Sequence, residues 1–273
     1  MRKLFVVLGD PVAHSRSPRI HARAFELLGV DAAYAPCRVR ADELERAVDG
    51  LRALGCAGFN VTVPHKEAVA AFLDRLDAEA SRIGAVNCVA LEGDALVGHN
   101  TDAPGLVRAL STGGVDRAAG ARAVIVGAGG AARAAAFALS QSGWPLTIVN
   151  RTAWRARELA ALVHAEHVEL GSDAARRALR EAALVVHCTT VGLGSDEVPF
   201  DPGLLGPAAT VVDLVYGGPT GETTLVRSVR ARNRRAVDGI DVLVHQAVAS
   251  LELWLGRPDL SQLAPRLREA AVS

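Results

Sequence analysis

A glycine-rich loop between an apolar strand pattern and an alanine-rich helix pattern restricts the second half of the chain to few folds. Residues 122–126 are strand-like, residues 127–132 follow the spacing G-x-G-x-x-A, and a helical pattern continues to about Ser142. The first Gly permits a tight turn, the second lets backbone N–H groups approach a phosphate, and the small final residue permits close helix–sheet packing. The pattern predicts a Rossmann-type unit that binds a pyrophosphate at a helix N-terminus.

The residues after the next predicted strand, 146–149, indicate which dinucleotide binds. An acidic side chain here would hold the ribose 2′-hydroxyl of NAD, but the sequence reads Asn150-Arg151-Thr152. Arg151 offers a guanidinium fork for a 2′-phosphate, and Arg155 adds a second charge, so we predict NADP(H) as the cofactor. The predicted cofactor residues are Gly127, Ala128, Gly129, Gly130, Ala131, Asn150, Arg151, Thr152, Arg155, Val215 and Gly239.

The remaining periodicity predicts two α/β domains. Strand-like and helix-like runs alternate in both halves of the chain, and a hairpin turn is expected at 92–94. Expected strands are 4–8, 32–39, 58–63, 86–91, 95–97, 122–126, 146–149, 184–187 and 210–213. Expected helices are 18–28, 42–54, about 67–73, about 102–110 across the domain boundary, 130–142, 154–163, 240–255 and about 260–271. We expect a substrate-binding domain with a mostly parallel sheet at 1–103, completed by 238–273, and a Rossmann-type NADP-binding domain at 104–237.

Composition excludes several classes of partner. The formal net charge is zero, which argues against nucleic acid and anionic membranes as main partners. The apolar N-terminal run is too short for a signal peptide, and no apolar run approaches the roughly 20 residues of a membrane span. The four cysteines are scattered without metal-ligand spacing. We therefore expect a cytoplasmic protein with no bound metal.

Lysine is almost absent, and one of the two copies stands in a polar segment. Of the thirty Lys and Arg residues only Lys3 and Lys66 are Lys, and Lys66 closes the segment 58–66. An Arg side chain keeps its proton at every working pH, whereas a Lys amine can release one. This placement suggests a proton-transfer role for Lys66. The alternative is that Lys66 is an ordinary surface lysine that stands there by chance.

Polar residues cluster at other turns of the first domain. Ser15 and Ser17 precede a predicted helix, where Ser17 suits an N-cap before Pro18, although two hydroxyls at a helix N-terminus also suit a carboxylate ligand. Asn87 and Asp102 lie in further turns, where Asn and Asp are common for conformational reasons. Together these side chains suit a small polyhydroxylated acid as the ligand.

These segments and their order along the chain resemble the motifs of the shikimate dehydrogenase family. The matching motifs are G-x-P-[IV]-x-H-S-x-S-P at 9–18, G-x-N-V-T-x-P-x-K at 58–66, G-A-V-N at 84–87, G-x-N-T-D-x-x-G at 98–105, G-A-G-G-A at 127–131, N-R-T at 150–152 and Q-A at 246–247. They span nearly the whole chain. The sequence differs from the usual N-A-T-S-x-G-M at 187–193, where it has His-Cys-Thr-Thr-Val-Gly-Leu, and Val242-Leu243 replaces the usual Met-Leu.

The resemblance implies NADPH-dependent reduction of 3-dehydroshikimate to shikimate. Lys66 would be the acid/base, hydrogen-bonded with Asp102 to the reacting oxygen. By motif match, the substrate-binding residues would be Ser15 and Ser17 for the carboxylate, and Thr62, Asn87, Asp102 and Gln246 for the ring hydroxyls.

Other activities and one other class of protein stay open at this point. The alternatives are a quinate/shikimate or aminoshikimate dehydrogenase and a non-catalytic sensor of the ligand or dinucleotide. Asn150, Arg151 and Ser17 favour shikimate and NADP, and the Lys66–Asp102 pair favours an enzyme. We expect a monomer or homodimer with a small-molecule substrate and with neither a nucleic-acid nor a membrane partner.

Overall fold

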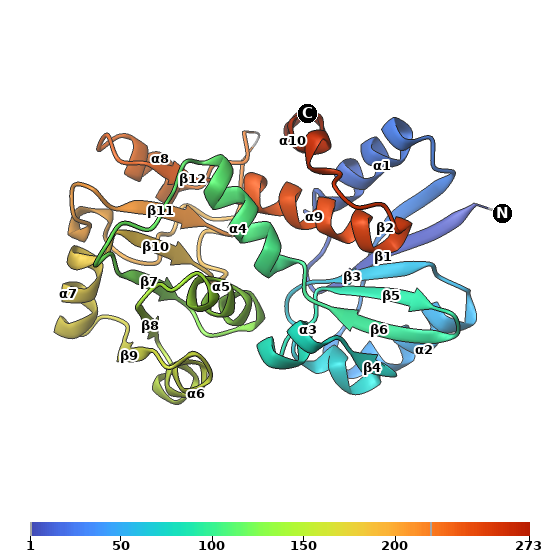
Figure 1. Cartoon of the computed structure of the whole chain (residues 1–273), viewed down its shortest axis with the longest axis horizontal. Coiled ribbons are helices and arrows are strands. Elements are labelled where there is room, and N and C mark those ends of the chain that lie inside the picture. Colours follow the sequence, from blue (N-terminus) through green and yellow to red (C-terminus); the bar gives the residue numbers. More distant parts are fainter. Residues whose placement is uncertain (1, 219) are drawn as a thin grey trace. The chain divides into compact units, whose positions relative to one another are not determined.

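The chain divides into two compact units. The computed structural model describes residues 2–218 and 220–273, and the units comprise Met1–Gly105 with Val244–Ser273, and Leu106–Leu243 (Figure 1). Helix α4 (Asp102–Thr112) carries the chain out of the first unit, and helix α9 (Gly239–Leu255) carries it back. Each unit is an α/β domain with its own six-stranded sheet, which confirms the predicted fold class.

The first unit contains a mixed sheet. Its strands are β1 (Lys3–Gly9), β2 (Ala32–Arg38), β3 (Gly58–Val61), β4 (Arg75–Leu76), β5 (Cys88–Glu92) and β6 (Ala95–His99), in the order β2-β1-β3-β5-β6-β4. Strand β1 pairs in parallel with β2 and β3, and β4 pairs in parallel with β6. The pairs β3–β5 and β5–β6 are antiparallel, and the tight turn after Glu92 joins β5 to β6. The parallel pair β1–β3 therefore ends in two adjacent loops that carry predicted site residues.

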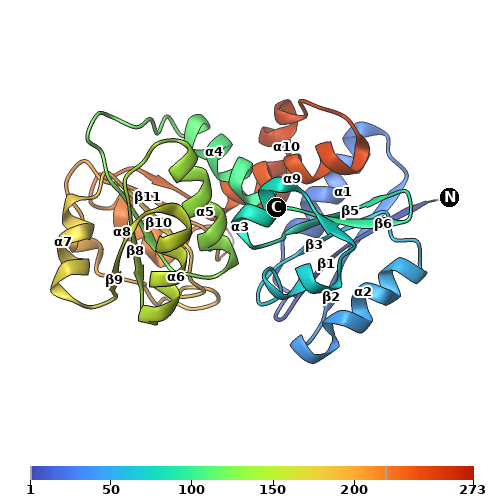
Figure 2. The ribbon, with the colours of Figure 1, turned by 60° about the horizontal axis from the view of Figure 1, so that its bottom comes forward.

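The helices of the first unit begin and end mostly where the sequence predicts. They are α1 (Ser17–Leu28), η1 (Ala41–Glu43), α2 (Leu44–Ala53), η2 (Ala68–Phe72), α3 (Ala78–Ile83), η4 (Ser261–Leu263) and α10 (Ala264–Val272). Helices α1 and α10 lie side by side (Figure 1 and Figure 2). The helix expected at about 67–73 is instead the short 3₁₀ helix η2. Just before η2, Lys66 O accepts the Val86 N–H at 2.7 Å.

An aromatic cluster fills one part of the first unit. The rings of Phe5 and Trp254 lie 4.7 Å apart, and His21 stacks on Tyr34 at 4.2 Å. His21 is fully buried, and neither ring nitrogen has a hydrogen-bond partner among the described residues. Burial lowers the pKa of His21 to about 3, because the charged imidazolium would lose its hydration. The first unit therefore contains a neutral histidine in an apolar environment.

The second unit contains an all-parallel sheet of six strands. They are β7 (Ala123–Val126), β8 (Leu146–Asn150), β9 (Glu166–Glu169), β10 (Leu184–His187), β11 (Thr210–Asp213) and β12 (Ala236–Val237), in the order β12-β11-β10-β7-β8-β9. The order reverses between β7 and β10, which is the topological switch point where dinucleotides bind in Rossmann folds. The helices between these strands are α5 (Gly130–Gln141), α6 (Ala153–Val163), α7 (Asp173–Glu181), η3 (Pro202–Leu204) and α8 (Thr224–Arg230).

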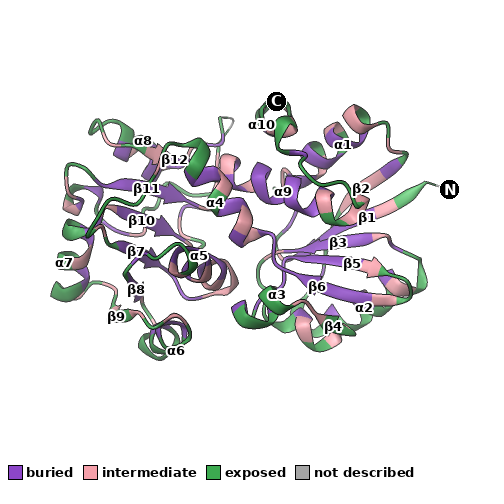
Figure 3. Cartoon of the chain, viewed as in Figure 1, coloured by how far each residue is buried: buried purple, intermediate pink, exposed green. Residues whose placement is uncertain are grey.

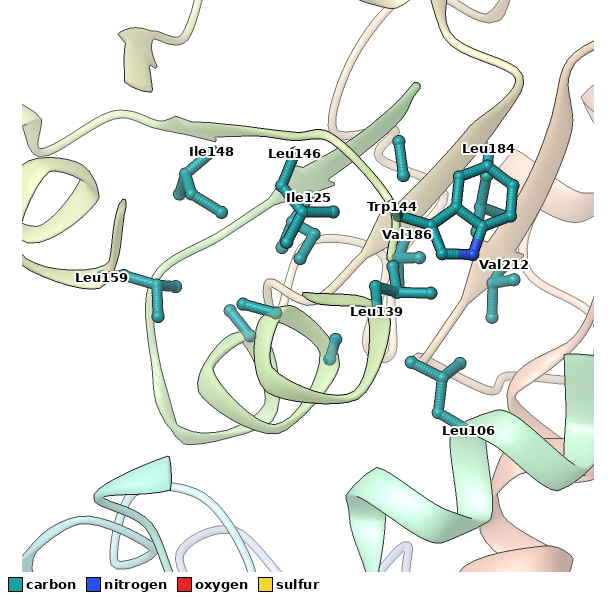
Figure 4. Packing of buried hydrophobic residues seen from close by; sticks show 14 of the residues in the cluster. Leu106, Ile125, Leu139, Trp144, Leu146, Ile148, Leu159, Leu184, Val186 and Val212 are labelled. Atoms are coloured by element: carbon teal, nitrogen blue, oxygen red, sulfur yellow. The ribbon is translucent and has the colours of Figure 1, made fainter. Parts of the chain in front are cut away.

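Small side chains allow α5 to pack closely on this sheet. Ala132, Ala135, Ala136 and Leu139 are almost fully buried in one core cluster, and Figure 4 shows Leu139 with Trp144 and Val186 among its members. The sequence analysis predicted neither the strands β4, β9 and β12 nor the helices α3, α7 and α8. Strand β9 reads Glu-His-Val-Glu and is largely exposed at the sheet edge (Figure 3), so it carries no apolar pattern.

Neither a membrane span nor a metal cluster is evident in the described part of the chain. Within residues 2–218 and 220–273, none of the helices combines the length and apolar character that crossing a bilayer requires. Among the same residues, no three His, Cys, Asp or Glu side chains are grouped so that they could hold a metal ion.

Candidate substrate and cofactor sites

Lys66 and Asp102 form a close ion pair in the first unit. Lys66 Nζ donates a hydrogen bond to Asp102 Oδ2 at 2.6 Å, and the two side chains are only 14% and 16% exposed. Lys66 follows β3, and the neighbouring His65 ring is held by a 2.7 Å contact between its Nε2 and Val39 O. Asp102 is the first residue of α4, where the positive end of the helix dipole favours a carboxylate. The pair leaves two further N–H donors on the Lys66 ammonium group.

Asn87 connects this ion pair to Gln246. The Asn87 Nδ2 group donates to Asp102 Oδ1 at 2.7 Å and to Gln246 Oε1 at 3.3 Å. Asn87 and Gln246 are 2% and 7% exposed, so both are desolvated. Gly105 permits this approach, since a Cβ there would lie 2.7 Å from the Gln246 backbone nitrogen. Four predicted residues from separate parts of the sequence therefore meet within one hydrogen-bonded cluster.

Four further polar residues extend the cluster. Thr101 Oγ1 accepts from Asn87 Nδ2 at 2.9 Å and contacts Ser250 Oγ at 3.1 Å. Asn60 Nδ2 donates to Ser250 Oγ at 3.1 Å, and Tyr34 donates to Asn60 Oδ1 at 2.8 Å. None of the four was among the predicted site residues. The spacing of Ser250 after Gln246, one helical turn apart in a mostly apolar helix, was a usable signal, whereas nothing near Tyr34 in sequence indicated its role.

Ser15 and Ser17 lie at the start of α1. The helix N-cap is Arg16, and no side chain caps this end, so the interpretation of Ser17 as the N-cap is wrong. The Ser15 Oγ instead accepts the Ser17 N–H at 3.3 Å, which draws Ser17 into the first turn, where it is 6% exposed. The two hydroxyls remain at a helix N-terminus, as a carboxylate site requires.

Thr62 lies in the loop after β3, beside the end of β1. Its backbone N–H donates to Leu8 O at 2.8 Å, which continues the parallel pairing of the two strands. A Cβ at Gly9 would lie 2.4 Å from Thr62 Cγ2, so only Gly fits opposite this side chain. The close approach brings the loop that carries Thr62 alongside the loop that leads to Ser15.

The glycine loop of the second unit follows β7. Gly127 has φ +124°, a conformation that side chains rarely adopt, and a Cβ there would lie 3.1 Å from the Cys188 carbonyl carbon. Gly129 is the N-cap of α5 and supplies no side-chain cap, so the first backbone N–H groups of the helix are left for another acceptor. This geometry suits a pyrophosphate.

Two exposed arginines follow β8. Asn150 ends the strand and donates from Nδ2 to Thr152 O at 3.0 Å, which shapes the turn into α6. Arg151 and Arg155 are both exposed, and the Arg155 guanidinium lies 5.3 Å from the centroid of the Trp154 ring. The first turn of α6 contains no acidic residue, so this end of the helix is uniformly favourable to an anion.

Val215 and Gly239 lie against each other near the carboxyl ends of β11 and β12. A Cβ at Gly239 would be 2.5 Å from Val215 O, which explains the need for glycine at the start of α9. The Val215 N–H donates to Asp213 Oδ1 at 3.0 Å, and Val215 is 7% exposed. The cofactor residues predicted from sequence thus follow four strands of one sheet.

Comparison with known proteins identifies two matching family regions. Residues 7–89 match the family described as the shikimate dehydrogenase substrate binding domain, and residues 109–192 match that described as shikimate / quinate 5-dehydrogenase. The chain is 46% identical over 266 residues to the NADP(+)-dependent shikimate dehydrogenase of Symbiobacterium thermophilum, covering 93% of this chain and 90% of the relative.

Solved structures extend the likeness to three dimensions. Shikimate 5-dehydrogenase from Thermus thermophilus, in complex with NADP(H) and shikimate, is 37% identical with a TM-score of 0.87, covering 98% of both chains. The ligand-free 5-ketofructose reductase of a Gluconobacter species is 34% identical with a TM-score of 0.81, also over 98% of both chains.

Proposed function

The chain belongs to the shikimate dehydrogenase family, and we infer that it catalyses the reversible NADP-dependent interconversion of shikimate and 3-dehydroshikimate. The observation that carries this proposal is the partly buried Lys66–Asp102 pair, joined through Asn87 to Gln246. We propose that residues 1–103 with 238–273 bind the substrate and that residues 104–237 bind NADP(H).

Lys66 is the proposed proton donor in the reductive direction. NADPH supplies the hydride that reduces the substrate carbonyl carbon to an alcohol carbon. Negative charge develops on the carbonyl oxygen, and the Lys66 ammonium stabilises this charge and transfers one proton to it. Asp102 holds the Lys66 ammonium group through the 2.6 Å hydrogen bond. This bond fixes the orientation of the ammonium group, so that its remaining N–H groups can point at the substrate oxygen. In the oxidative direction the neutral Lys66 amine takes the hydroxyl proton.

The other predicted side chains orient the substrate. Ser15 and Ser17 offer two hydroxyls beside the N-terminus of α1 for the carboxylate. Thr62, Asn87, Asp102 and Gln246 offer hydrogen-bonding groups to the ring hydroxyls. Burial makes these bonds selective, because a ligand that lacked a matching hydroxyl would leave the buried Asn87 and Gln246 amides poorly paired.

The cofactor residues fit NADP(H) better than NAD(H). The Gly127–Gly130 backbone and the start of α5 suit the pyrophosphate, while Arg151 and Arg155 present exposed positive charge where the 2′-phosphate would lie. Asn150 and Thr152 shape the turn that carries Arg151. Val215 and Gly239, which follow neighbouring strands, would complete the surface against the dinucleotide.

The direct test is a matrix of substrates and cofactors. Shikimate and quinate would each be supplied with NADP and with NAD, and 5-ketofructose with NADPH, while the nicotinamide absorbance is followed. We expect rapid turnover with shikimate and NADP, and much slower turnover in every other combination. Preferential reduction of 5-ketofructose would assign the chain the activity of the Gluconobacter relative, preferred turnover of quinate would make it a quinate dehydrogenase, and no turnover would favour a sensor.

We further propose that the protein acts in the cytoplasm as a monomer or homodimer, without a nucleic-acid or membrane partner. The zero formal net charge supports the absence of polyanionic partners. Size-exclusion chromatography with light scattering would measure the mass in solution. A tetramer or larger assembly would contradict the proposed oligomeric state.

A further inference from the structure

A buried hydrogen-bonded chain lies at the carboxyl ends of β10 and β11. His187 and Asp213 are register partners in these parallel strands and are 0% and 1% exposed. The Asp213 Oδ1 atom lies 2.8 Å from His187 Nδ1, and His187 Nε2 lies 2.6 Å from Thr189 Oγ1. None of these three residues belongs to the predicted cofactor or substrate set.

The partners determine which atoms carry the protons. Asp213 accepts hydrogen bonds from the Val215 N–H at 3.0 Å and from the Thr223 hydroxyl at 2.5 Å, as an ionised carboxylate would. In the singly protonated tautomer that donates from Nδ1 to Asp213, His187 Nε2 is left to accept the Thr189 hydroxyl proton. The Val191 N–H in turn donates to Thr189 Oγ1 at 3.1 Å. Each donor in this arrangement is thus paired with an acceptor.

This hydrogen-bonded chain therefore orients the hydroxyl of Thr189. Its proton is directed at His187, and one lone pair accepts from Val191, which leaves the second lone pair as an acceptor. Thr189 is only half-buried, unlike His187. Thr189 is thus the most exposed member of the hydrogen-bonded chain Asp213–His187–Thr189.

Sheet topology places this acceptor on one side of the glycine loop. Strand β10 lies next to β7, the Cys188 N–H donates to Val126 O at 2.8 Å, and Gly127 packs against Cys188. Strand β8, with Arg151 after it, lies on the opposite side of β7. A dinucleotide crosses this edge with its pyrophosphate at the loop after β7. With the 2′-phosphate half beside β8, the nicotinamide half must extend over β10.

We propose that His187, held by Asp213, is a positioning residue that orients Thr189 as a hydrogen-bond acceptor for the nicotinamide half of NADP(H). This rests on the proposed function, because it takes NADP(H) as the ligand. The nicotinamide carboxamide supplies N–H donors, which match an acceptor whose own proton is already committed. The effect should therefore be confined to ligands that contain the nicotinamide half.

The test compares the whole cofactor with its adenosine half. Calorimetric titration would measure the dissociation constants of NADP and of 2′,5′-ADP for the unmodified protein and for the Thr189→Val variant. We expect the variant to bind NADP about three- to tenfold more weakly, as the loss of one neutral hydrogen bond predicts, and to bind 2′,5′-ADP within about twofold of the original. Thr189→Ser, which restores the hydroxyl, should recover most of the affinity for NADP.

A double-mutant cycle tests the role of His187. His187→Leu should weaken NADP binding to a similar extent, and His187→Leu with Thr189→Val should be no weaker than either single variant, because both remove the same interaction. Thr210→Val is the control for the same substitution elsewhere, since Thr210 is a buried threonine that begins β11, at the far end of the strand from Asp213. Thermal unfolding would verify that each variant is folded.

The outcomes separate this proposal from the proposed function. If the unmodified protein bound neither NADP nor 2′,5′-ADP, the cofactor assignment and the positioning role would both fail. If it bound both and Thr189→Val bound both equally well, the positioning role alone would be overturned. Equal weakening of NADP and 2′,5′-ADP would also overturn it, because the variant would then act on the whole site.

Discussion

The two candidate sites are built in different ways. In the first unit the site consists of buried or half-buried side chains that contact one another, including Lys66, Asp102, Asn87 and Gln246. In the second unit the predicted site consists of backbone at Gly127–Gly130 and exposed charges at Arg151 and Arg155. Mutations in the first site should therefore affect several neighbours at once, whereas mutations in the second should act one contact at a time.

The strongest test of the first site is removal of its titratable amine. Lys66→Ala should lower kcat for shikimate oxidation by about a hundred- to ten-thousandfold, because general acid–base catalysis contributes that much. Steady-state kinetics with NADP would measure the change. Lys3→Ala is the matched control, since Lys3 is the other lysine of the chain and is exposed. A similar kcat for Lys66→Ala and Lys3→Ala would refute the catalytic assignment.

The corresponding test of the second site removes one exposed charge. Arg151→Ala should raise the KM for NADPH about ten- to hundredfold and leave the KM for NADH nearly unchanged, because only NADPH carries the 2′-phosphate. Arg157→Ala, an exposed arginine elsewhere on α6, provides the control. If both cofactors were affected equally, the 2′-phosphate would not be the partner of Arg151.

The buried His21 makes the stability of the first unit sensitive to pH. Its pKa is lowered to about 3 in the folded state, so the unfolded chain, with an ordinary His pKa near 6.5, binds protons more readily between these values. Stability is therefore fully present above about pH 6.5 and falls as the pH decreases toward 3. This group alone should reduce the free energy of unfolding by about 2 kcal/mol between pH 7 and pH 5.

Denaturant unfolding of the original protein and of His21→Phe at pH 7 and pH 5 would measure this effect. The variant keeps an aromatic ring against Tyr34 but has no titrating group. It should lose about 2 kcal/mol less stability on acidification than the original. An identical pH dependence in both proteins would mean that His21 is hydrated or protonated in the folded state.

The smallest expected effect concerns a residue that binds substrate without taking part in proton transfer. Gln246→Ala should raise the KM for shikimate about three- to tenfold, as expected for one neutral hydrogen bond, with the KM for NADP unchanged. Ser250→Ala is a useful comparison, because Ser250 lies one turn further along α9 and contacts Asn60 and Thr101. An unchanged KM for shikimate in Gln246→Ala would place Gln246 outside the substrate site.

The sequence alone was sufficient for many features that depend on neighbours in the chain. The tight turn at Gly127, the termination of α1 at Gly29 with φ +64°, and the three- and four-residue apolar spacing of α9 are local properties, and each was visible as a motif or period. The longer apolar strands of the two sheets were predicted for the same reason, whereas β4, β9 and β12 were not. Weakly patterned elements such as β9 and α7 were missed, and the N-cap role of Ser17 was wrong because the Ser15 hydroxyl takes its N–H.

Only the tertiary structure decided which side chains meet. Asn87 contacts Gln246 across 159 positions, and the Asn60–Ser250 bond spans 190, so no local pattern could reveal either contact. The His187–Asp213 pair likewise depends on the pairing of β10 with β11. Local propensity determines the elements, whereas long-range contacts depend on how those elements pack, and the packing is set by burial and hydrogen bonding summed over the whole domain.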